Sequence, residues 1–109
     1  MLPEDEVERA RALCRARSSE ALADQVRIEL EVDRGALTIV EVQASWHART
    51  EWTRLPVARL RFAKGTGLWT LYAPGRDARW RRYEGIGPAA SVGPLLREVD
   101  RDPTGAFWG

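Results

Sequence analysis

Apolar and charged residues alternate strictly from Val26 to Val32. This alternation predicts a β-strand with one buried face. The turn sequence DRGA follows, and a second strand is predicted from Leu37 to about Trp46. Because the second strand is apolar on both faces, we expect it to be covered on both sides. Residues 47–56 are predicted to form a loop ending at a proline, and three further strands are predicted at 57–63, 68–73 and 78–83.

Helical patterns flank these strands on both sides. Pro3 and the acidic residues after it are typical of a helix start, and an apolar stripe continues to about Arg17. A second helix is predicted to begin after the capping residue Ser91 and to end at Asp102-Pro103. Two aromatic residues of the tail are expected to dock on the core: Phe107 and Trp108.

The order of helix, five meandering strands and helix indicates an α+β fold, with an antiparallel sheet and both helices on one face of it. The chain has 109 residues, which is the usual size of a single domain with one modest core. Within this domain we expect a helical N-terminal segment (1–24), the sheet (25–84) and a C-terminal helix with its tail (85–109).

The register of the last three strands predicts which side chains share a face. If the turns KGTG and PGRD are both four-residue loops, the strands can be paired by counting outward from each turn. One face then consists of core residues, namely Leu60, Phe62, Trp69, Leu71 and Trp80. The opposite face gathers four arginines around a tyrosine: Arg59, Arg61, Tyr72, Arg79 and Arg81.

Charge is unevenly distributed along the chain, although the net charge is only +1. Residues 49–82 carry nine basic residues against two acidic ones, a net charge of +7, whereas the segments before and after them are acidic. Two interpretations of the arginine face stay open. It is either an ordinary solvated sheet face with a local cation–π contact at Tyr72, or an anion-binding surface for nucleic acid or an acidic protein.

Catalytic chemistry has few candidates in this sequence. His47 is the only histidine and Cys14 the only cysteine, so we expect no metal site. Phosphate loops and dinucleotide-binding motifs are absent, so no cofactor is expected. Glu41 shares the predicted inward face of its strand with apolar residues, and a buried carboxylate there needs a partner such as Arg54 or Arg82.

The predicted loop after the second strand combines aromatic and ionisable groups. Loops carry functional residues more often than regular elements do, which makes this segment a second candidate site. The alternative is that its tryptophans only close the edge of the core. The candidate residues are Trp46, His47, Glu51, Trp52 and Arg54.

Two features bear on the location of the protein. A single cysteine cannot form an intramolecular disulfide, and the charged N-terminal sequence lacks the apolar run of a signal peptide. We therefore expect a cytoplasmic protein. No apolar stretch is long enough to span a bilayer, so no membrane partner is expected.

Three tryptophan-bearing blocks resemble those of a known family. They read EWTRLPVARLRF, TGLWTLYAPGRDARWRRYEGI and LLREVDRDPTGAFWG. Over about residues 22–109 the chain resembles a family of small bacterial proteins that is classed as a domain of unknown function, number three thousand and twenty-four. The resemblance implies a common scaffold for the three blocks. It implies no activity, cofactor or catalytic residue.

These observations favour a binding or accessory domain that uses the arginine face or the loop, with nucleic acid as the preferred ligand class. Two alternatives from other classes remain. A structural homodimer would bury Val40, Val42 and Trp46 across a twofold axis. A small enzyme would use Glu41 or Glu51 together with His47 and would need a concave site near them.

Overall fold

The structure is a computed structural model that describes residues 2–22, 24–44 and 51–109. Its centre is one five-stranded antiparallel sheet in which each strand pairs with its neighbours in sequence. This meander confirms the predicted α+β fold. The strands are β1 (Val26–Val32), β2 (Ala36–Ala44), β3 (Trp52–Ala63), β4 (Leu68–Pro74) and β5 (Trp80–Arg82).

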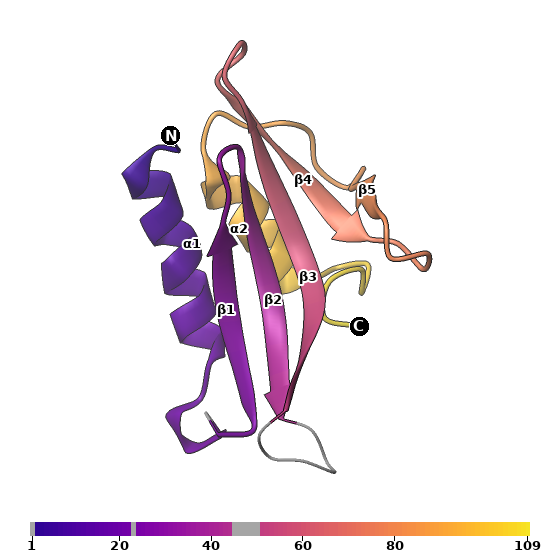
Figure 1. Cartoon of the computed structure of the whole chain (residues 1–109). Coiled ribbons are helices and arrows are strands. Elements are labelled where there is room, and N and C mark those ends of the chain that lie inside the picture. Colours follow the sequence, from indigo (N-terminus) through magenta and orange to yellow (C-terminus); the bar gives the residue numbers. More distant parts are fainter. Residues whose placement is uncertain (1, 23, 45–50) are drawn as a thin grey trace.

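Two helices pack on one face of the sheet, and α2 lies behind the strands in Figure 1. Helix α1 (Glu4–Arg17) contacts β1, β2 and α2, while α2 (Val92–Arg101) contacts β3 and β4. A short 3-10 helix, η1 (Glu20–Leu22), lies between α1 and β1 in the sequence. Neither helix of the described ranges has the length and apolar character needed to cross a membrane. We call the two sides of the sheet the helix-covered face and the helix-free face.

Glu6 of α1 joins the two helices at the start of α2. Ser91 caps α2 as predicted, because its hydroxyl accepts a hydrogen bond from the Gly93 amide at 3.2 Å. The Glu6 carboxylate accepts hydrogen bonds from the Val92 amide and, at 3.3 Å, from the Ser91 hydroxyl. The unpaired N–H groups at the start of α2 are thus satisfied partly by a residue of α1.

The core lies between the helix-covered face and the two helices. Leu60 and Trp69 have no exposed surface, and the rings of Phe62 and Trp69 lie 4.9 Å apart across the β3–β4 pair. The strict alternation of these strands therefore directs one apolar row toward the helices, as predicted. Helix α2 contributes the four apolar residues expected of it: Val92, Leu95, Leu96 and Val99.

The C-terminal tail docks on the core through both predicted aromatic residues. Asp102 ends α2 with a left-handed backbone (φ 46°), and its carboxylate accepts hydrogen bonds from the amides of Phe107 at 3.1 Å and Trp108 at 2.8 Å. The Trp108 indole donates to the Val99 carbonyl at 2.8 Å. Arg17 of α1 lies over the Trp108 ring, 4.0 Å from its centroid. The tail therefore connects α2 to the end of α1.

Strand β3 begins earlier than predicted, because the loop was expected to reach Pro56 and the strand already starts at Trp52. Strand β4 pairs only with Arg59–Ala63, so no strand of the described ranges pairs with the outer edge of the first half of β3. A proline, which lacks an N–H group, is tolerated at such an edge. The register with β2 shifts between Ile39 and Val40, which marks a β-bulge beside Pro56.

Candidate functional site

The predicted register between β3 and β4 is confirmed, and it places two arginines beside Tyr72 on the helix-free face. Arg59 pairs directly with Tyr72, and Arg61 pairs with Thr70. The Arg61 guanidinium lies over the Tyr72 ring, 5.8 Å from the ring centroid. This distance is within the range of a cation–π contact.

The predicted register between β4 and β5 is wrong. Tyr72 pairs with Arg82, three positions beyond its predicted partner Arg79. Because three is an odd number, every side chain of β5 lies on the face opposite to the predicted one. Arg79 lies in the exposed turn before β5, and Arg81 lies on the helix-covered side of the sheet edge. Neither of them joins the arginines of β3.

A longer turn than predicted, Gly75–Arg79, accounts for the shift. The Gly75 amide donates to the Arg79 carbonyl at 2.7 Å and closes the turn. The Asp77 carboxylate accepts a hydrogen bond from the Arg79 amide at 3.2 Å and pairs with Arg81 at 3.0 Å. Ala78 adopts a left-handed backbone (φ 62°), and a Cβ atom at Gly75 would lie 3.0 Å from the Arg79 carbonyl. The aspartate in the turn sequence was the available signal, since such side chains stabilise turns of their own.

Trp80 and Arg82 therefore lie where Arg79 and Arg81 were expected. Trp80, predicted as a core residue, pairs with Pro74 on the helix-free face and is only half-buried. Arg82, predicted at the inward edge, is exposed on the same face. We define the arginine–aromatic patch by five residues of β3, β4 and β5: Arg59, Arg61, Tyr72, Trp80 and Arg82.

The charges of the arginine–aromatic patch are mostly uncompensated. Arg59 is the most constrained of the three arginines, because it donates to the Thr38 hydroxyl at 3.2 Å and lies 3.9 Å from the Asp33 carboxylate. In the described part of the chain, no carboxylate lies within ion-pair distance of Arg61 or Arg82. Both side chains are exposed. The patch thus offers three positive charges with one acidic neighbour at its margin.

The other half of the helix-free face, over β1 and the start of β3, is balanced in charge. Arg54 forms ion pairs with Glu31 and, at 3.7 Å, with Glu29. Arg27 lies 3.5 Å from Glu29 and 4.4 Å from the centroid of the Trp52 ring. Two arginines and two glutamates therefore neutralise one another here, and this region offers little attraction to an anion.

Val40 and Val42 lie beneath this balanced network and are 4% and 2% exposed. Their neighbours across the strands are the charged residues Glu29, Arg27 and Arg54. The expectation that β2 is covered on both sides is therefore met within one chain. The two valines on which the homodimer hypothesis was based are thus already buried within one chain and offer no surface to a second copy. Its third residue, Trp46, lies outside the described residues.

Glu41 does not form the predicted ion pair. Its carboxylate accepts a hydrogen bond from the Gln43 side chain at 3.1 Å, and the residue is half-buried. Arg54 pairs instead with the glutamates of β1. Arg82 lies on β5, three strands away from β2. Both predicted partners are wrong because the sequence did not reveal which face each arginine occupies.

The five loop candidates fall partly within the described residues. Trp46 and His47 lie outside the described residues. Trp52 and Arg54 belong to β3 rather than to a loop, and Glu51 is exposed immediately before that strand. The enzyme hypothesis, which needs His47 beside Glu41 or Glu51, therefore has no described geometry to support it. Within the described ranges, no group of three or more His, Cys, Asp or Glu residues is arranged to hold a metal ion.

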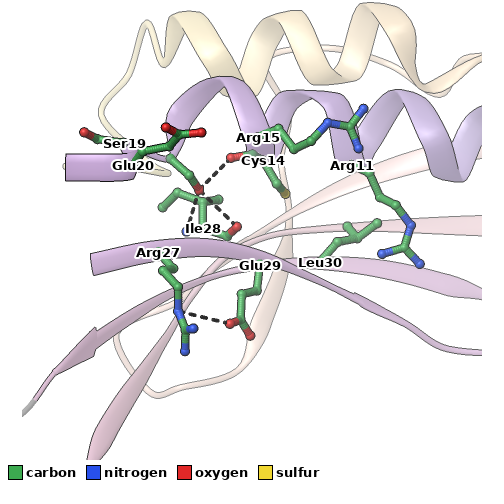
Figure 2. A pocket seen from close by; sticks show the side chains of 10 residues that line it. Arg11, Cys14, Arg15, Ser19, Glu20, Arg27, Ile28, Glu29 and Leu30 are labelled. Atoms are coloured by element: carbon green, nitrogen blue, oxygen red, sulfur yellow. Dashed lines mark hydrogen bonds and ion pairs between the residues drawn. The ribbon is translucent and has the colours of Figure 1, made fainter. Parts of the chain in front are cut away.

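Two hollows follow the seam between α1 and β1, and sequence reasoning identified neither of them. The first has a volume of about 570 Å³ and the second about 630 Å³. Figure 2 shows the first, with Arg11 and Arg15 projecting from α1 and Arg27 and Glu29 from β1. Burial raises the pKa of Cys14 in this hollow to about 11, against the opposing effect of the two α1 arginines. The thiol is therefore protonated at neutral pH and is a poor nucleophile.

Comparison with known proteins identifies the family but no function. No curated protein and no solved structure matches the chain. The family profile named DUF3024, a domain of unknown function, matches residues 2–109. The match is longer than the resemblance seen over 22–109, because it also includes α1. The chain therefore belongs to the DUF3024 family.

Proposed function

We propose that the arginine–aromatic patch binds single-stranded nucleic acid. One observation carries the proposal: Tyr72 lies on an uncovered sheet face with Arg61 over its ring and with Arg59 and Arg82 on the two neighbouring strands. Arginine forms bidentate contacts with phosphate, and an aromatic ring stacks on any unpaired base. The patch combines both groups on one rigid surface.

The position of the aromatic rings favours a single strand over a duplex. Tyr72 and Trp80 are half-buried on the same face, on adjacent strands about 4.8 Å apart. Aromatic rings on the surface of a sheet can stack on unpaired bases, because the faces of these bases are accessible. In a duplex the base faces are already stacked on one another. The preference expected from the patch is therefore for unpaired RNA or DNA, without strong sequence selection.

The small number of charges sets the expected salt dependence. Three arginines that each neutralise a phosphate give a slope of about −2 for log K against log salt on a single strand. Binding is expected to be weak at physiological ionic strength and measurable at low salt. A slope near zero would contradict an electrostatic contact.

Fluorescence anisotropy with labelled oligo(U) and oligo(dT) at low salt tests the proposal. The double variant Arg61→Gln/Arg82→Gln removes two charges from the patch and is expected to weaken binding about tenfold or more. Arg79→Gln/Arg81→Gln removes the same charge from exposed positions off the patch and is expected to change affinity less than about twofold. Equal effects of the two variants, or no binding by the native protein, would refute the proposal.

The role of Tyr72 can be separated from charge by two further variants. Tyr72→Phe keeps the ring and is expected to bind nearly as well as the native protein. Tyr72→Ala removes the stacking surface, which is worth about 1–3 kcal/mol per base, and is expected to weaken binding at least about fivefold. If Tyr72→Ala binds these oligonucleotides normally while the arginine variants do not, binding depends on phosphate contacts alone, and base stacking on Tyr72 is refuted.

A further inference from the structure

Strand β1 is one edge of the sheet, and alternate residues of it direct their backbone groups away from β2. The Ala44 amide donates to the Gln25 carbonyl at 2.8 Å, and the Asp33 amide donates to the Ala36 carbonyl at 2.9 Å. Odd-numbered residues at the two ends of β1 thus bond toward β2. In an antiparallel pair the intervening residues point their N–H and C=O groups outward. The outward residues of β1 are Val26, Ile28, Leu30 and Val32.

One outward position of β1 is occupied by a side chain of the same chain. The Ser18 hydroxyl accepts a hydrogen bond from the Ile28 amide at 3.1 Å and lies 3.4 Å from the Ile28 carbonyl. It also donates to the Cys14 carbonyl at 2.9 Å. No residue of the described ranges hydrogen-bonds to the outward groups of Leu30 or Val32. Ser18 therefore occupies the outward backbone groups of Ile28, whereas those of Leu30 and Val32 are available to a further strand.

The available part of the edge lies in a groove. The two hollows along the α1–β1 seam share Arg11; Leu30 lines the first and Val32 the second. Figure 2 shows Leu30 below α1, with Arg11 reaching toward β1 beside it. Val32 is 46% exposed although it is a large apolar residue. An extended segment laid in this groove would pair with the backbone and cover the apolar surface together.

We propose that this groove binds an extended peptide as an additional strand of the sheet. The peptide residue opposite Leu30 points its side chain to the helix-covered side, where Arg11 lies. Arg11 has no carboxylate partner among the ion pairs of the described residues, so this position suits an aspartate or glutamate. The peptide residue opposite Val32 meets the exposed valine and suits an apolar side chain. An acidic side chain there would be repelled by the carboxylates that also line this hollow, namely those of Glu4, Asp5, Glu8 and Asp33. The partner is thus an extended segment with an acidic and an apolar residue two positions apart.

The charges of β1 disfavour a second copy of this chain as the occupant. In every antiparallel register that joins Leu30 or Val32 to the same residues of a second copy, two carboxylates face each other across the new pair. Pairing Leu30 with its own counterpart, for example, sets Glu29 opposite Glu31 of the second copy. The outward residues Leu30 and Val32 also bring no carboxylate to Arg11. A separate peptide can satisfy both conditions.

A synthetic peptide tests this inference directly. The probe is a short fluorescein-labelled peptide of alternating valine and threonine with one central aspartate on the valine side of the strand. Saturable binding to the full chain is expected, together with slower hydrogen exchange of the Leu30 and Val32 amides in NMR spectra. A peptide with lysine in place of the aspartate, and one N-methylated at the amides that face Leu30 and Val32, are expected to bind at least about fivefold more weakly.

The matched protein variants are two arginines of the same helix. Arg11→Gln is expected to weaken binding of the aspartate peptide about fivefold. Arg9→Gln is expected to leave it unchanged, because Arg9 lies on another side of α1 near Gly93. Three results would overturn the proposal: no saturable binding, binding without protection of the Leu30 and Val32 amides, or equal affinity for the aspartate and lysine peptides. Light scattering that reveals a dimer with the same two amides protected would assign the edge to a second copy instead.

Discussion

The two faces of the sheet are built from the same strands by different means. The helix-covered face consists mainly of buried apolar residues that pack against α1, α2 and the tail. The outer surface of the helix-free face is formed mainly by long polar and aromatic side chains, which form a balanced ion network over β1 and a mostly uncompensated arginine–aromatic patch over β4. Because burial supplies most folding free energy, the first face holds the fold together. The second face is therefore free to present charge.

Neighbouring residues of β3 test this comparison most strongly. Leu60 is fully buried on the helix-covered face, and Arg61 is exposed on the other. Leu60→Ala is expected to lower the free energy of unfolding by about 2–5 kcal/mol, since it removes buried methyl groups and leaves a cavity. Arg61→Ala is expected to cost less than about 0.5 kcal/mol. Urea denaturation of both variants measures the difference, and similar losses would show that the two faces share the stability more evenly.

Ser18 joins the end of α1 to the edge strand β1, and its replacement measures how much this connection stabilises the fold. Ser18→Ala removes the hydrogen bonds that tie the Cys14 carbonyl and the Ile28 backbone together. We expect a loss of about 1–2 kcal/mol and faster exchange of the Ile28 amide. Ser19→Ala, at the next and exposed position, is the control and is expected to be neutral. Unchanged exchange at Ile28 would contradict the assigned role of Ser18.

Cys14 of α1, which packs on the helix-covered face, gives the stability of the fold a pH dependence. Burial raises the pKa of its thiol from 9.0 to about 11 in the folded state. Between these values the unfolded chain loses the proton first, so folding stability falls as pH rises. Relative to Cys14→Ala, the native protein is expected to lose about 1 kcal/mol between pH 7 and pH 10. Chemical denaturation at the two pH values measures this loss. An equal change in the free energy of unfolding for the native protein and Cys14→Ala would contradict the prediction.

Arg54 is expected to give the smallest effect, because its ion pairs are partly exposed. Exposed ion pairs contribute about 0–1 kcal/mol to the free energy of unfolding, and salt screens the attraction between their charges. Arg54→Met keeps the aliphatic stem beside Val42 and is expected to cost less than Arg54→Ala, which also exposes the valine. Thermal denaturation at low and high salt separates the two contributions. A loss above about 2 kcal/mol for Arg54→Met would show that the ion network itself stabilises the fold.

Sequence reasoning predicted the fold well where local signals are strong. The period of two residues placed β1 and β4, and the capping residue Ser91 placed the start of α2. The β3–β4 register was also predictable, because the KGTG turn ends at Gly67 with a positive φ of 71°, which suits glycine. In these elements propensity, turn chemistry and burial all agree.

The candidate site was less predictable because it depends on one turn length. Counting four residues for the PGRD turn placed Arg79 and Arg81 on the patch, whereas the turn Gly75–Arg79 places Trp80 and Arg82 there. In either register one row of side chains has Trp80 and Arg82 and the alternate row has Arg79, Arg81 and Tyr83, so both rows combine arginine with an aromatic residue and the hydrophobic pattern did not discriminate between the two registers. The hollows between α1 and β1 could not be predicted either, because they depend on how the helix packs beside the edge strand.

The contact between Arg17 and Trp108 has a consequence for the order of folding. Arg17 also donates to the Asp100 carbonyl at 2.7 Å and pairs with its carboxylate at 3.0 Å, across 83 positions of sequence. The hairpins of the sheet, by contrast, join strands that are consecutive in the chain. Short loops close faster than long ones. The meander can therefore form before the contacts between Arg17 of α1 and the C-terminal residues Asp100 and Trp108. On a ribosome, α1 would emerge before the sheet, and the part of its apolar stripe that packs against α2 would stay exposed until α2 and the tail had been synthesised.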